Sequence, residues 1–228
     1  LAPFMRKMPA RGIVDKHGRF SKLTLTCACW CQPPKFVIIV VVVIITKVAV
    51  VILNYNGIHW LKKFLGNVVE KTSNAEVIIT DNASTDDSVN YITNNFPSVK
   101  LILNKTNEGY AGGYNKALQQ ISAEYFILLN SDVEVTKNWI TPIIELMDSD
   151  KSIAACQPKI KKYDDKKSFE YAGASGGFLD KYGYPFCRGR VFETLEEDKG
   201  QYEDTSEVFW ASGACLFLRS EAFYEVGG

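Results

Sequence analysis

Short runs of consecutive apolar residues recur along the chain from residue 47 onward. Residues 125–129 are five apolar residues in a row between polar neighbours. Such a run is too short for a helix but suits a strand buried on both faces of a parallel sheet. Residues 48–53, 75–80 and 99–103 have the same character, so we predict strands there as well.

Between these predicted strands the apolar positions follow helical spacing. The clearest case is 58–71, whose apolar residues are Ile58, Leu61, Phe64, Leu65, Val68 and Val69. We predict two further helices, over 86–96 and 112–121. Strands and helices that alternate with short loops indicate an α/β fold with a mostly parallel, doubly wound sheet.

The pattern loosens beyond residue 136. We predict, in order, a helix over 136–147 with Pro142 in its early turns, a strand over 153–160, a glycine-rich meander over 169–180, a long excursion over 181–206, a strand over 208–218 and a helix over 219–226. We therefore divide the chain into an N-terminal appendage outside the fold (1–46), a regular first half (47–135) and a second half (136–228).

The N-terminal appendage is basic and contains the most hydrophobic run. Residues 1–46 hold seven Lys or Arg against one acidic residue. The apolar run 36–46 is eleven residues long, and a helix of that length rises about 16 Å against about 30 Å of hydrocarbon. A loosely attached segment is the main interpretation, with a membrane span or a signal-peptide core as alternatives. The basic charge and the apolar run together favour peripheral association with a membrane.

The remaining residues, 47–228, carry a net charge of −6, because the whole chain is neutral. Nucleic-acid backbones are bound by clustered Lys and Arg, so an acidic body argues against nucleic-acid binding. An acidic protein that binds an anionic nucleotide needs a divalent cation between them.

Polar side chains follow each predicted strand, where open α/β sheets bind their ligands. Asn130, Ser131 and Asp132 come directly after 125–129. One carboxylate beside an amide is a sparse set of oxygen ligands, which Mg²⁺ or Mn²⁺ accepts when substrate phosphates complete its shell. We predict Asp132 as a metal ligand. The alternative is a turn, or an N-cap for a helix near Thr136.

Two further polar segments follow the second and third strands. Asp81 is placed to accept a hydrogen bond from a base N–H, and a buried carboxylate there would select a uracil or thymine base. Asp86 is equally suited to capping a helix. The segment 107–115 opens a helix with three glycines, which lets backbone approach a ligand closely. It lacks the Gly-Lys-Ser/Thr of a P-loop.

Five motifs together resemble the catalytic domain of the family 2 glycosyltransferases, which have the GT-A fold, and in particular its bacterial rhamnosyltransferase-like branch. The motifs are Val50-Val-Ile-Leu-Asn-Tyr-Asn-Gly57, Thr80-Asp-Asn-Ala-Ser-Thr-Asp86, Asn107-Glu-Gly-Tyr-Ala-Gly-Gly-Tyr-Asn115, Leu128-Leu-Asn-Ser-Asp132 and Trp210-Ala-Ser-Gly-Ala214. The resemblance covers residues 47–228 in the family's order and spacing. It implies that 47–135 is the nucleotide-sugar-binding half and that 136–228 is the acceptor-side half, incomplete at its C-terminus. It implies transfer of a sugar from a nucleotide-diphosphate donor to an acceptor, with inversion.

The resemblance also assigns roles to residues. Asn54 and Asn56 would lie beside the nucleotide, Asp81 would hold the base, and Asp132 would occupy the metal-binding end of the D-x-D motif. The donor-binding set is completed by Asn82, Asn107, Gly109, Asn115 and Asn130, and the acceptor side by Trp210 and Gly213. Asn130 stands where the first Asp of D-x-D usually is, which weakens the charge of the metal site.

The resemblance places the catalytic base beyond Gly228, in a Glu-Asp pair that this sequence does not contain. We therefore expect the chain to bind donor better than it turns donor over. The implied donor is a dTDP- or UDP-sugar, with dTDP-rhamnose as one candidate, and the implied cofactor is Mg²⁺ or Mn²⁺. The implied acceptor is a polysaccharide or glycolipid, reached in the cytoplasm or at the inner face of the membrane. The alternatives are a non-catalytic nucleotide-sugar-binding module and a phosphoacceptor signalling domain.

Overall fold

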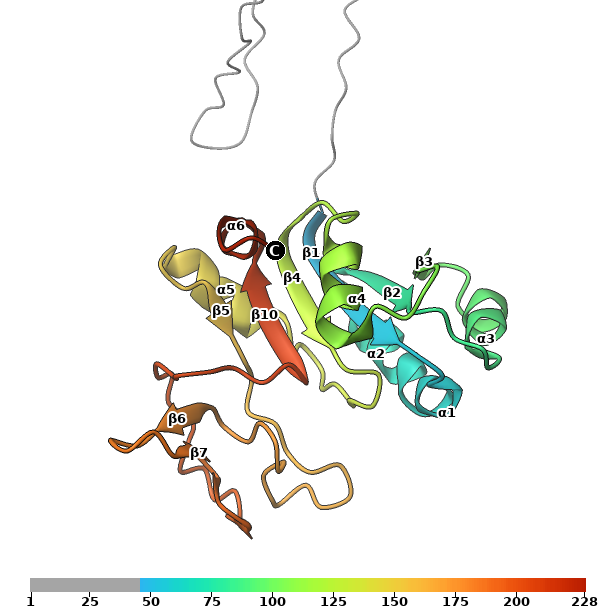
Figure 1. The fold of residues 1–228 in the computed structure, drawn as a ribbon. Coiled ribbons are helices and arrows are strands. Elements are labelled where there is room, and N and C mark those ends of the chain that lie inside the picture. Colours follow the sequence, from blue (N-terminus) through green and yellow to red (C-terminus); the bar gives the residue numbers. More distant parts are fainter. Residues whose placement is uncertain (1–45) are drawn as a thin grey trace, which may run out of the picture. The chain divides into compact units, whose positions relative to one another are not determined.

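A computed structural model describes residues 46–228 (Figure 1). The predictions for the N-terminal appendage fall on residues outside this range, except for Thr46, which begins the first strand. Within residues 46–228 no helix is long and apolar enough to cross a bilayer.

Six strands form the central sheet. In chain order they are β1 (Thr46–Asn54), β2 (Glu76–Asp81), β3 (Lys100–Leu103), β4 (Ala123–Leu129), β5 (Ala155–Cys156) and β10 (Cys215–Arg219). Their spatial order is β3-β2-β1-β4-β10-β5. The strands β1 to β4 are parallel, whereas β10 is antiparallel to both of its neighbours. The mostly parallel sheet predicted from the sequence is confirmed, and the second half of the chain adds strands to the same sheet.

Helices cover both faces of this sheet. They are α1 (Ile58–Trp60), the π-helix η1 (Leu61–Leu65), α2 (Gly66–Lys71), α3 (Ser88–Asn95), α4 (Gly109–Leu118), α5 (Thr141–Ser149) and α6 (Ser220–Glu225). Successive strand residues point to opposite faces. Val50 therefore packs with residues of η1, α2, α3 and α5, whereas Val51 packs with residues of α4 and α6. This arrangement is doubly wound, as the alternating pattern predicts.

Some predicted boundaries are wrong beyond residue 104. The helix predicted over 112–121 begins at Gly109. The helix predicted from 136 begins at Thr141, because Pro142 occupies its first turn, where a missing N–H costs nothing. The strand predicted over 153–160 shrinks to β5. The strand predicted over 208–218 begins only at Cys215, because Trp210 pairs instead with Gly177 in a second, smaller sheet.

The smaller sheet was missed by the sequence analysis. It consists of β6 (Gly177–Leu179), β7 (Pro185–Cys187), β8 (Arg190–Val191) and β9 (Thr194–Leu195), all antiparallel. Its strands have only two or three residues, too few to show an alternating pattern. One face packs on a small core of Phe169, Ala174 and Cys187.

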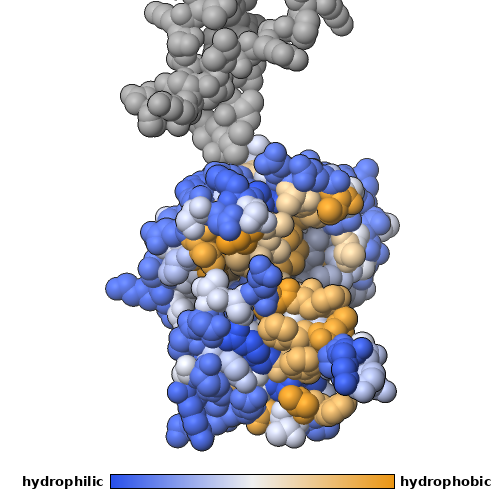
Figure 2. All heavy atoms as spheres, turned by 90° about the vertical axis from the view of Figure 1, so that its left-hand side faces the viewer, coloured by the Kyte–Doolittle hydropathy of each residue, from blue (hydrophilic) through white to orange (hydrophobic). Residues whose placement is uncertain are grey.

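Large apolar side chains are exposed on the segment that forms this smaller sheet. They are Leu179, Tyr182, Tyr184, Val191, Phe192 and Phe209. Figure 2 shows a patch of hydrophobic residues in the lower part of the surface, which this segment forms.

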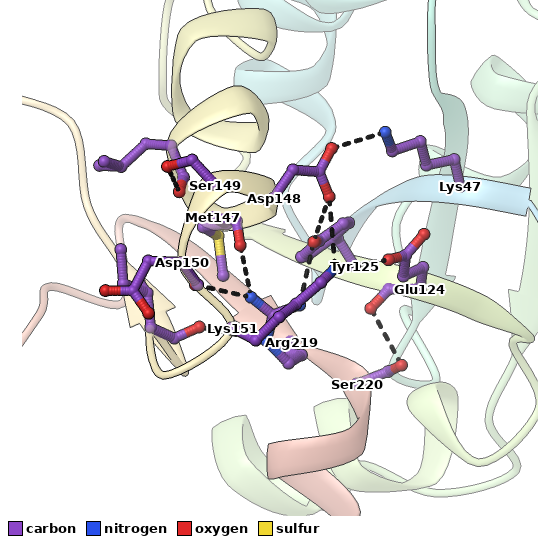
Figure 3. Close-up of polar contacts among 12 residues, drawn as sticks. Lys47, Glu124, Tyr125, Met147, Asp148, Ser149, Asp150, Lys151, Arg219 and Ser220 are labelled. Carbon is purple, nitrogen blue, oxygen red and sulfur yellow. Dashed lines mark hydrogen bonds and ion pairs between the residues drawn. The ribbon is translucent and has the colours of Figure 1, made fainter. Parts of the chain in front are cut away.

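Arg219 joins β10 to the C-terminal end of α5 by hydrogen bonds, at the end of the sheet where β1 and β4 begin (Figure 3). It is only 7% exposed, and its guanidinium donates to the carbonyls of Met147 and Ile153 and to the Tyr125 hydroxyl. The Tyr125 hydroxyl in turn donates to Asp148, 2.6 Å away. Burial, followed by the bond to Asp148, raises the pKa of Tyr125 to about 12. The hydroxyl therefore stays protonated and keeps donating.

Replacing Arg219 by Met is expected to lower the free energy of unfolding by about 2–4 kcal/mol, because the buried hydroxyl and carbonyls would lose their donor. Urea denaturation at neutral pH measures this change. The matched control is Lys151→Met, since Lys151 forms only exposed ion pairs with Glu124 and Asp148. The control should change stability by less than about 0.5 kcal/mol. A loss for Arg219→Met as small as that of the control would contradict the role given to this residue.

Candidate functional site

The carboxyl ends of β1 and β4 border a cavity of about 330 Å³, and β2 ends beside β1. The cavity is lined by residues 53 and 55–57 at the end of β1, His59 and Trp60 of α1, Tyr110 of α4, and residues 130–132 after β4. A larger cavity of about 740 Å³ lies between the end of α2 and the start of α5. Of the predicted site residues, none lines the larger cavity, whereas three line the smaller one: Asn56, Asn130 and Asp132.

Asp81 is a buried carboxylate held by three donors. Its Oδ1 accepts from the Ser84 N–H at 2.8 Å, and its Oδ2 accepts from the Ser84 hydroxyl at 2.6 Å and from Asn54 Nδ2 at 2.9 Å. A carboxylate oxygen can accept two hydrogen bonds. Oδ1 therefore keeps capacity for one more donor, whereas Oδ2 is saturated.

Asn54 completes this cluster and contains an unsatisfied acceptor. Its Nδ2 donates to Asp81 and to the Ser84 hydroxyl, while its buried Oδ1 has no hydrogen-bond partner among the described residues. A Cβ at Gly57 would lie 2.4 Å from this Oδ1. Because Gly57 has no side chain, its backbone can lie close to Asn54 Oδ1.

Asn56 joins the loop after β1 to the loop after β2. It adopts a left-handed conformation with φ of 51°, which Asn tolerates better than most residues. Its Oδ1 accepts from the Thr85 N–H at 2.7 Å, and its own N–H donates to the Ser84 hydroxyl. The side chain of Asn56 is therefore used to hold two loops together at the edge of the cavity.

Asp86 has a structural role, although the N-cap residue of α3 is its neighbour Asp87. Its two carboxylate oxygens accept from the N–H of Ile58, which begins α1, and from the N–H of Ser88, which begins α3. Burial alone would raise the pKa of Asp86, but the hydrogen bonds from Ser88 and Ile58 outweigh it and hold the pKa below its ordinary value. The residue anchors two helix starts.

Asn82 uses all of its hydrogen-bonding capacity inside the protein. Its Nδ2 donates to Asn107 Oδ1 at 2.7 Å and to the Gly109 carbonyl at 3.0 Å, and its Oδ1 accepts from Asn104 Nδ2 and from the Glu108 N–H. An amide side chain offers two donors and two acceptor lone pairs. In this structure Asn82 therefore positions the glycine-rich loop and has no free group to offer a ligand.

Tyr110, which the sequence analysis did not single out, connects three segments of the site. Its hydroxyl donates to the Gly213 carbonyl at 2.9 Å and lies 3.4 Å from Asn130 Oδ1. The neighbouring backbone is joined as well, because the Asn130 N–H donates to the Ala214 carbonyl. Hydrophobic periodicity gives no signal at Tyr110, because the residue stands in a glycine-rich stretch.

Asp132 is exposed and lies in a turn directly after β4. Since α5 begins only at Thr141, the N-cap alternative for this segment is wrong. None of the ion pairs formed among residues 46–228 involves Asp132. Within the same residues, no three His, Cys, Asp or Glu side chains are grouped as a metal site. The donor set is one free carboxylate with Asn130 and Ser131 beside it, which suits a hard cation only if a ligand supplies further oxygens.

Eight predicted site residues are not part of the cavity lining: Asn54, Asp81, Asn82, Asn107, Gly109, Asn115, Trp210 and Gly213. Asn115 donates from Nδ2 to the Gly228 carbonyl at 2.6 Å, toward α6. Trp210 packs over Gly177 in the core of the smaller sheet, so close that a Cβ at Gly177 would overlap its ring. Gly213 is nearer the cavity, through its hydrogen bond to Tyr110.

Known proteins resemble this chain in sequence and in fold. Residues 49–227 match the sequence model of the family described as Glycosyl transferase family 2. The chain is 25% identical, over 198 residues, to N-acetylglucosaminyl-diphospho-decaprenol L-rhamnosyltransferase of Mycobacterium tuberculosis, which covers 78% of this chain and 63% of that protein. It is also 25% identical to N-acetylgalactosaminyltransferase 6 of Drosophila melanogaster, over 79% of this chain and 28% of that protein.

Among solved structures, the mannosyltransferase PcManGT from Pyrobaculum calidifontis, in complex with GDP-Man and Mn²⁺, resembles the chain in fold. Its TM-score is 0.53 at 17% sequence identity, over 80% of this chain and 47% of that one. The chain thus spans less than two thirds of the length of each of these three proteins.

Replacing Gly57 by Ala is expected to lower the free energy of unfolding by about 1–3 kcal/mol, because the new methyl group would collide with Asn54 Oδ1. The matched control is Gly66→Ala, where the nearest atom is 4.0 Å away. That helical position should gain up to about 1 kcal/mol. Urea unfolding of both variants measures the difference. Equal stability of the two variants would show that the loop after β1 is not packed against Asn54 as described.

Proposed function

Because the chain belongs to glycosyl transferase family 2, we propose that it binds a nucleoside-diphosphate sugar and transfers the sugar to a saccharide or lipid-linked saccharide acceptor. The family and the GT-A fold predicted from the sequence are confirmed. One observation carries the proposal: residues at the ends of the parallel strands β1 and β4 line a cavity that contains one carboxylate, Asp132, which forms no ion pair among residues 46–228.

The base would bind at the Asp81 end of the site. Asp81 Oδ1 has capacity for one further donor, and Asn54 Oδ1 nearby has no partner among the described residues. Two buried acceptors fit a ligand that brings N–H donors, and the N3–H of uracil or thymine is such a group. Because a buried acceptor left unpaired costs about 1–3 kcal/mol, this arrangement would discriminate against bases without that donor. The proposed donor is therefore a UDP- or dTDP-sugar, dTDP-rhamnose among them.

The diphosphate would lie at Asp132. A Mg²⁺ or Mn²⁺ ion held there by Asp132, with Asn130 beside it, would stabilise the charge that develops on the leaving diphosphate. Asn130 contributes no charge, so the substrate phosphates must supply most of the anionic ligands. The cation named with PcManGT supports a divalent metal as cofactor.

The acceptor would approach from the side of Gly213 and the smaller sheet. The rhamnosyltransferase named above acts, by its name, on a diphospho-decaprenol carrier. We extend the proposal to a lipid-linked acceptor, which would bring the chain to the cytoplasmic face of a membrane. Transfer with inversion needs a base for the acceptor hydroxyl, and we propose that this base lies in sequence beyond Gly228.

A nucleotide-sugar-binding module without turnover is the second candidate. The observation that favours it is that Asp132 is the single carboxylate among the described residues that line the cavity. If Asp132 binds the metal, no second carboxylate of this lining is available as the base. Hydrolysis of the donor, measured with the full-length gene product, separates the two functions.

We expect UDP or dTDP with MnCl₂ to raise the melting temperature of the chain. At a ligand concentration of about 100 times Kd, binding adds about 2.7 kcal/mol of stability, which corresponds to about 5 °C or more. Asp132→Asn should remove the part of the rise that depends on Mn²⁺, because it replaces the charged ligand by a neutral one of the same shape. Differential scanning fluorimetry with and without EDTA measures this.

The control for this experiment is Asp164→Asn, which changes a carboxylate that is 72% exposed in another loop. It should leave the rise unchanged. If no nucleotide raises the melting temperature of the unmodified chain, the proposed function is wrong. If Asp132→Asn retains the full Mn²⁺-dependent rise, the metal is bound elsewhere.

A further inference from the structure

Tyr110 stands where the donor side of the cavity meets the acceptor side. It lies in the first turn of α4, lines the cavity and is 53% exposed. Its hydroxyl contacts Gly213, which precedes β10, and Asn130, which follows β4. A single side chain thus borders the loops after β4 and before β10.

The hydrogen-bonding capacity of this hydroxyl is only partly used. Both neighbours, the Gly213 carbonyl at 2.9 Å and Asn130 Oδ1 at 3.4 Å, are acceptors. A phenol has one proton, so the shorter contact receives it. Partial burial raises the pKa of Tyr110, against an opposing effect of the Tyr114 hydroxyl, so the proton is retained at neutral pH. The Tyr114 hydroxyl donates its proton to the Leu129 carbonyl at 3.2 Å, so no hydrogen bond among the described residues uses the lone pairs of the Tyr110 oxygen.

Gly213 lies directly against the hydroxyl of Tyr110. A Cβ at position 213 would lie 2.7 Å from Tyr110 Oη, but the next nearest ring atom is 3.5 Å away, an ordinary contact. A side chain at position 213 would therefore require the Tyr110 hydroxyl to shift, whereas the ring could stay in place. The hydrogen bond to the Gly213 carbonyl holds the Tyr110 oxygen in place. A lone pair of this oxygen remains available to a ligand.

The order of groups in a nucleotide sugar indicates what would meet that lone pair. In the proposed function the base lies by Asp81 and Asn54, and the diphosphate lies at Asp132. The sugar follows the diphosphate, so it lies on the side away from the base. Asn56 is hydrogen-bonded to the loop that follows Asp81, whereas Tyr110 and Asn130 contact the segment before β10.

We propose that Tyr110 determines sugar specificity: its hydroxyl accepts a hydrogen bond from a hydroxyl group of the donor sugar while donating its own proton to the Gly213 carbonyl. The inference rests on the proposed function, because it assumes that a nucleotide sugar occupies the cavity. It assigns to Tyr110 a contact with the sugar and none with the base or the diphosphate.

The test compares Tyr110→Phe with the unmodified chain by calorimetry in the presence of MnCl₂. The probes are UDP and UDP-glucose, and dTDP and dTDP-glucose. The variant should bind the free nucleotide with a Kd within about twofold of the unmodified chain, and should bind the nucleotide sugar about three- to tenfold more weakly, the effect of one lost hydrogen bond. Equal changes for nucleotide and nucleotide sugar, or no change in either, would overturn the inference.

Two further variants separate a contact with the sugar from a general disturbance. Tyr184→Phe removes the same hydroxyl group from an exposed tyrosine of the smaller sheet, outside the cavity lining, and should change neither affinity. As a single substitution, Gly213→Ala should weaken nucleotide-sugar binding, because its methyl group displaces Tyr110 Oη. In the Tyr110→Phe background it should have little further effect, so additive losses would contradict the proposed geometry.

The outcomes distinguish the inference from the function on which it rests. If the unmodified chain binds none of the four probes, the proposed function fails, and the inference fails with it. If the unmodified chain binds both a nucleotide and its sugar conjugate, and Tyr110→Phe binds them equally well, only the role of Tyr110 is wrong.

Discussion

The burial of the Asp81 carboxylate at the end of β2 is the constraint on which the site depends. A buried charge is tolerated only when donors surround it, and here they come from Ser84 and from Asn54 of the neighbouring strand. The next residue, Asn82, meets the same requirement by binding the loop over 104–109. The hydrogen bonds of these two adjacent side chains therefore connect the loops that follow β1, β2 and β3.

The two ends of the central sheet are built differently. Where β4 begins, Arg219 and Tyr125 are buried and their donors are paired with carbonyls and with Asp148, which joins α5 firmly to β10. Where β4 ends, Asp132 is exposed, and Asn54 Oδ1 has no partner among residues 46–228. The first end is suited to stability and the second to binding, since unpaired polar groups gain most from a ligand.

The smaller sheet explains how the second half of the chain reaches the site. Trp210 packs over Gly177 and holds the chain away from the central sheet until Cys215. The connecting residues 211–214 then pass Tyr110 and Asn130, where the Gly213 and Ala214 carbonyls accept hydrogen bonds. The core of the smaller sheet thus determines where the acceptor-side loop approaches the cavity.

The sequence by itself determined the strands β1 to β4, the helices between them and the edge at which their polar residues gather, because hydrophobic periodicity and strand length are local properties. It also indicated Asp81 and Asp132 from their places at the ends of strands, and Asn56 through the resemblance to the family. Only the tertiary structure decided that Asn82 is saturated, that Trp210 belongs to a separate core and that Tyr110 borders the cavity. These facts depend on contacts between residues 20 or more positions apart, such as Asn82 with Asn107 and Tyr110 with Gly213, and no local pattern records them.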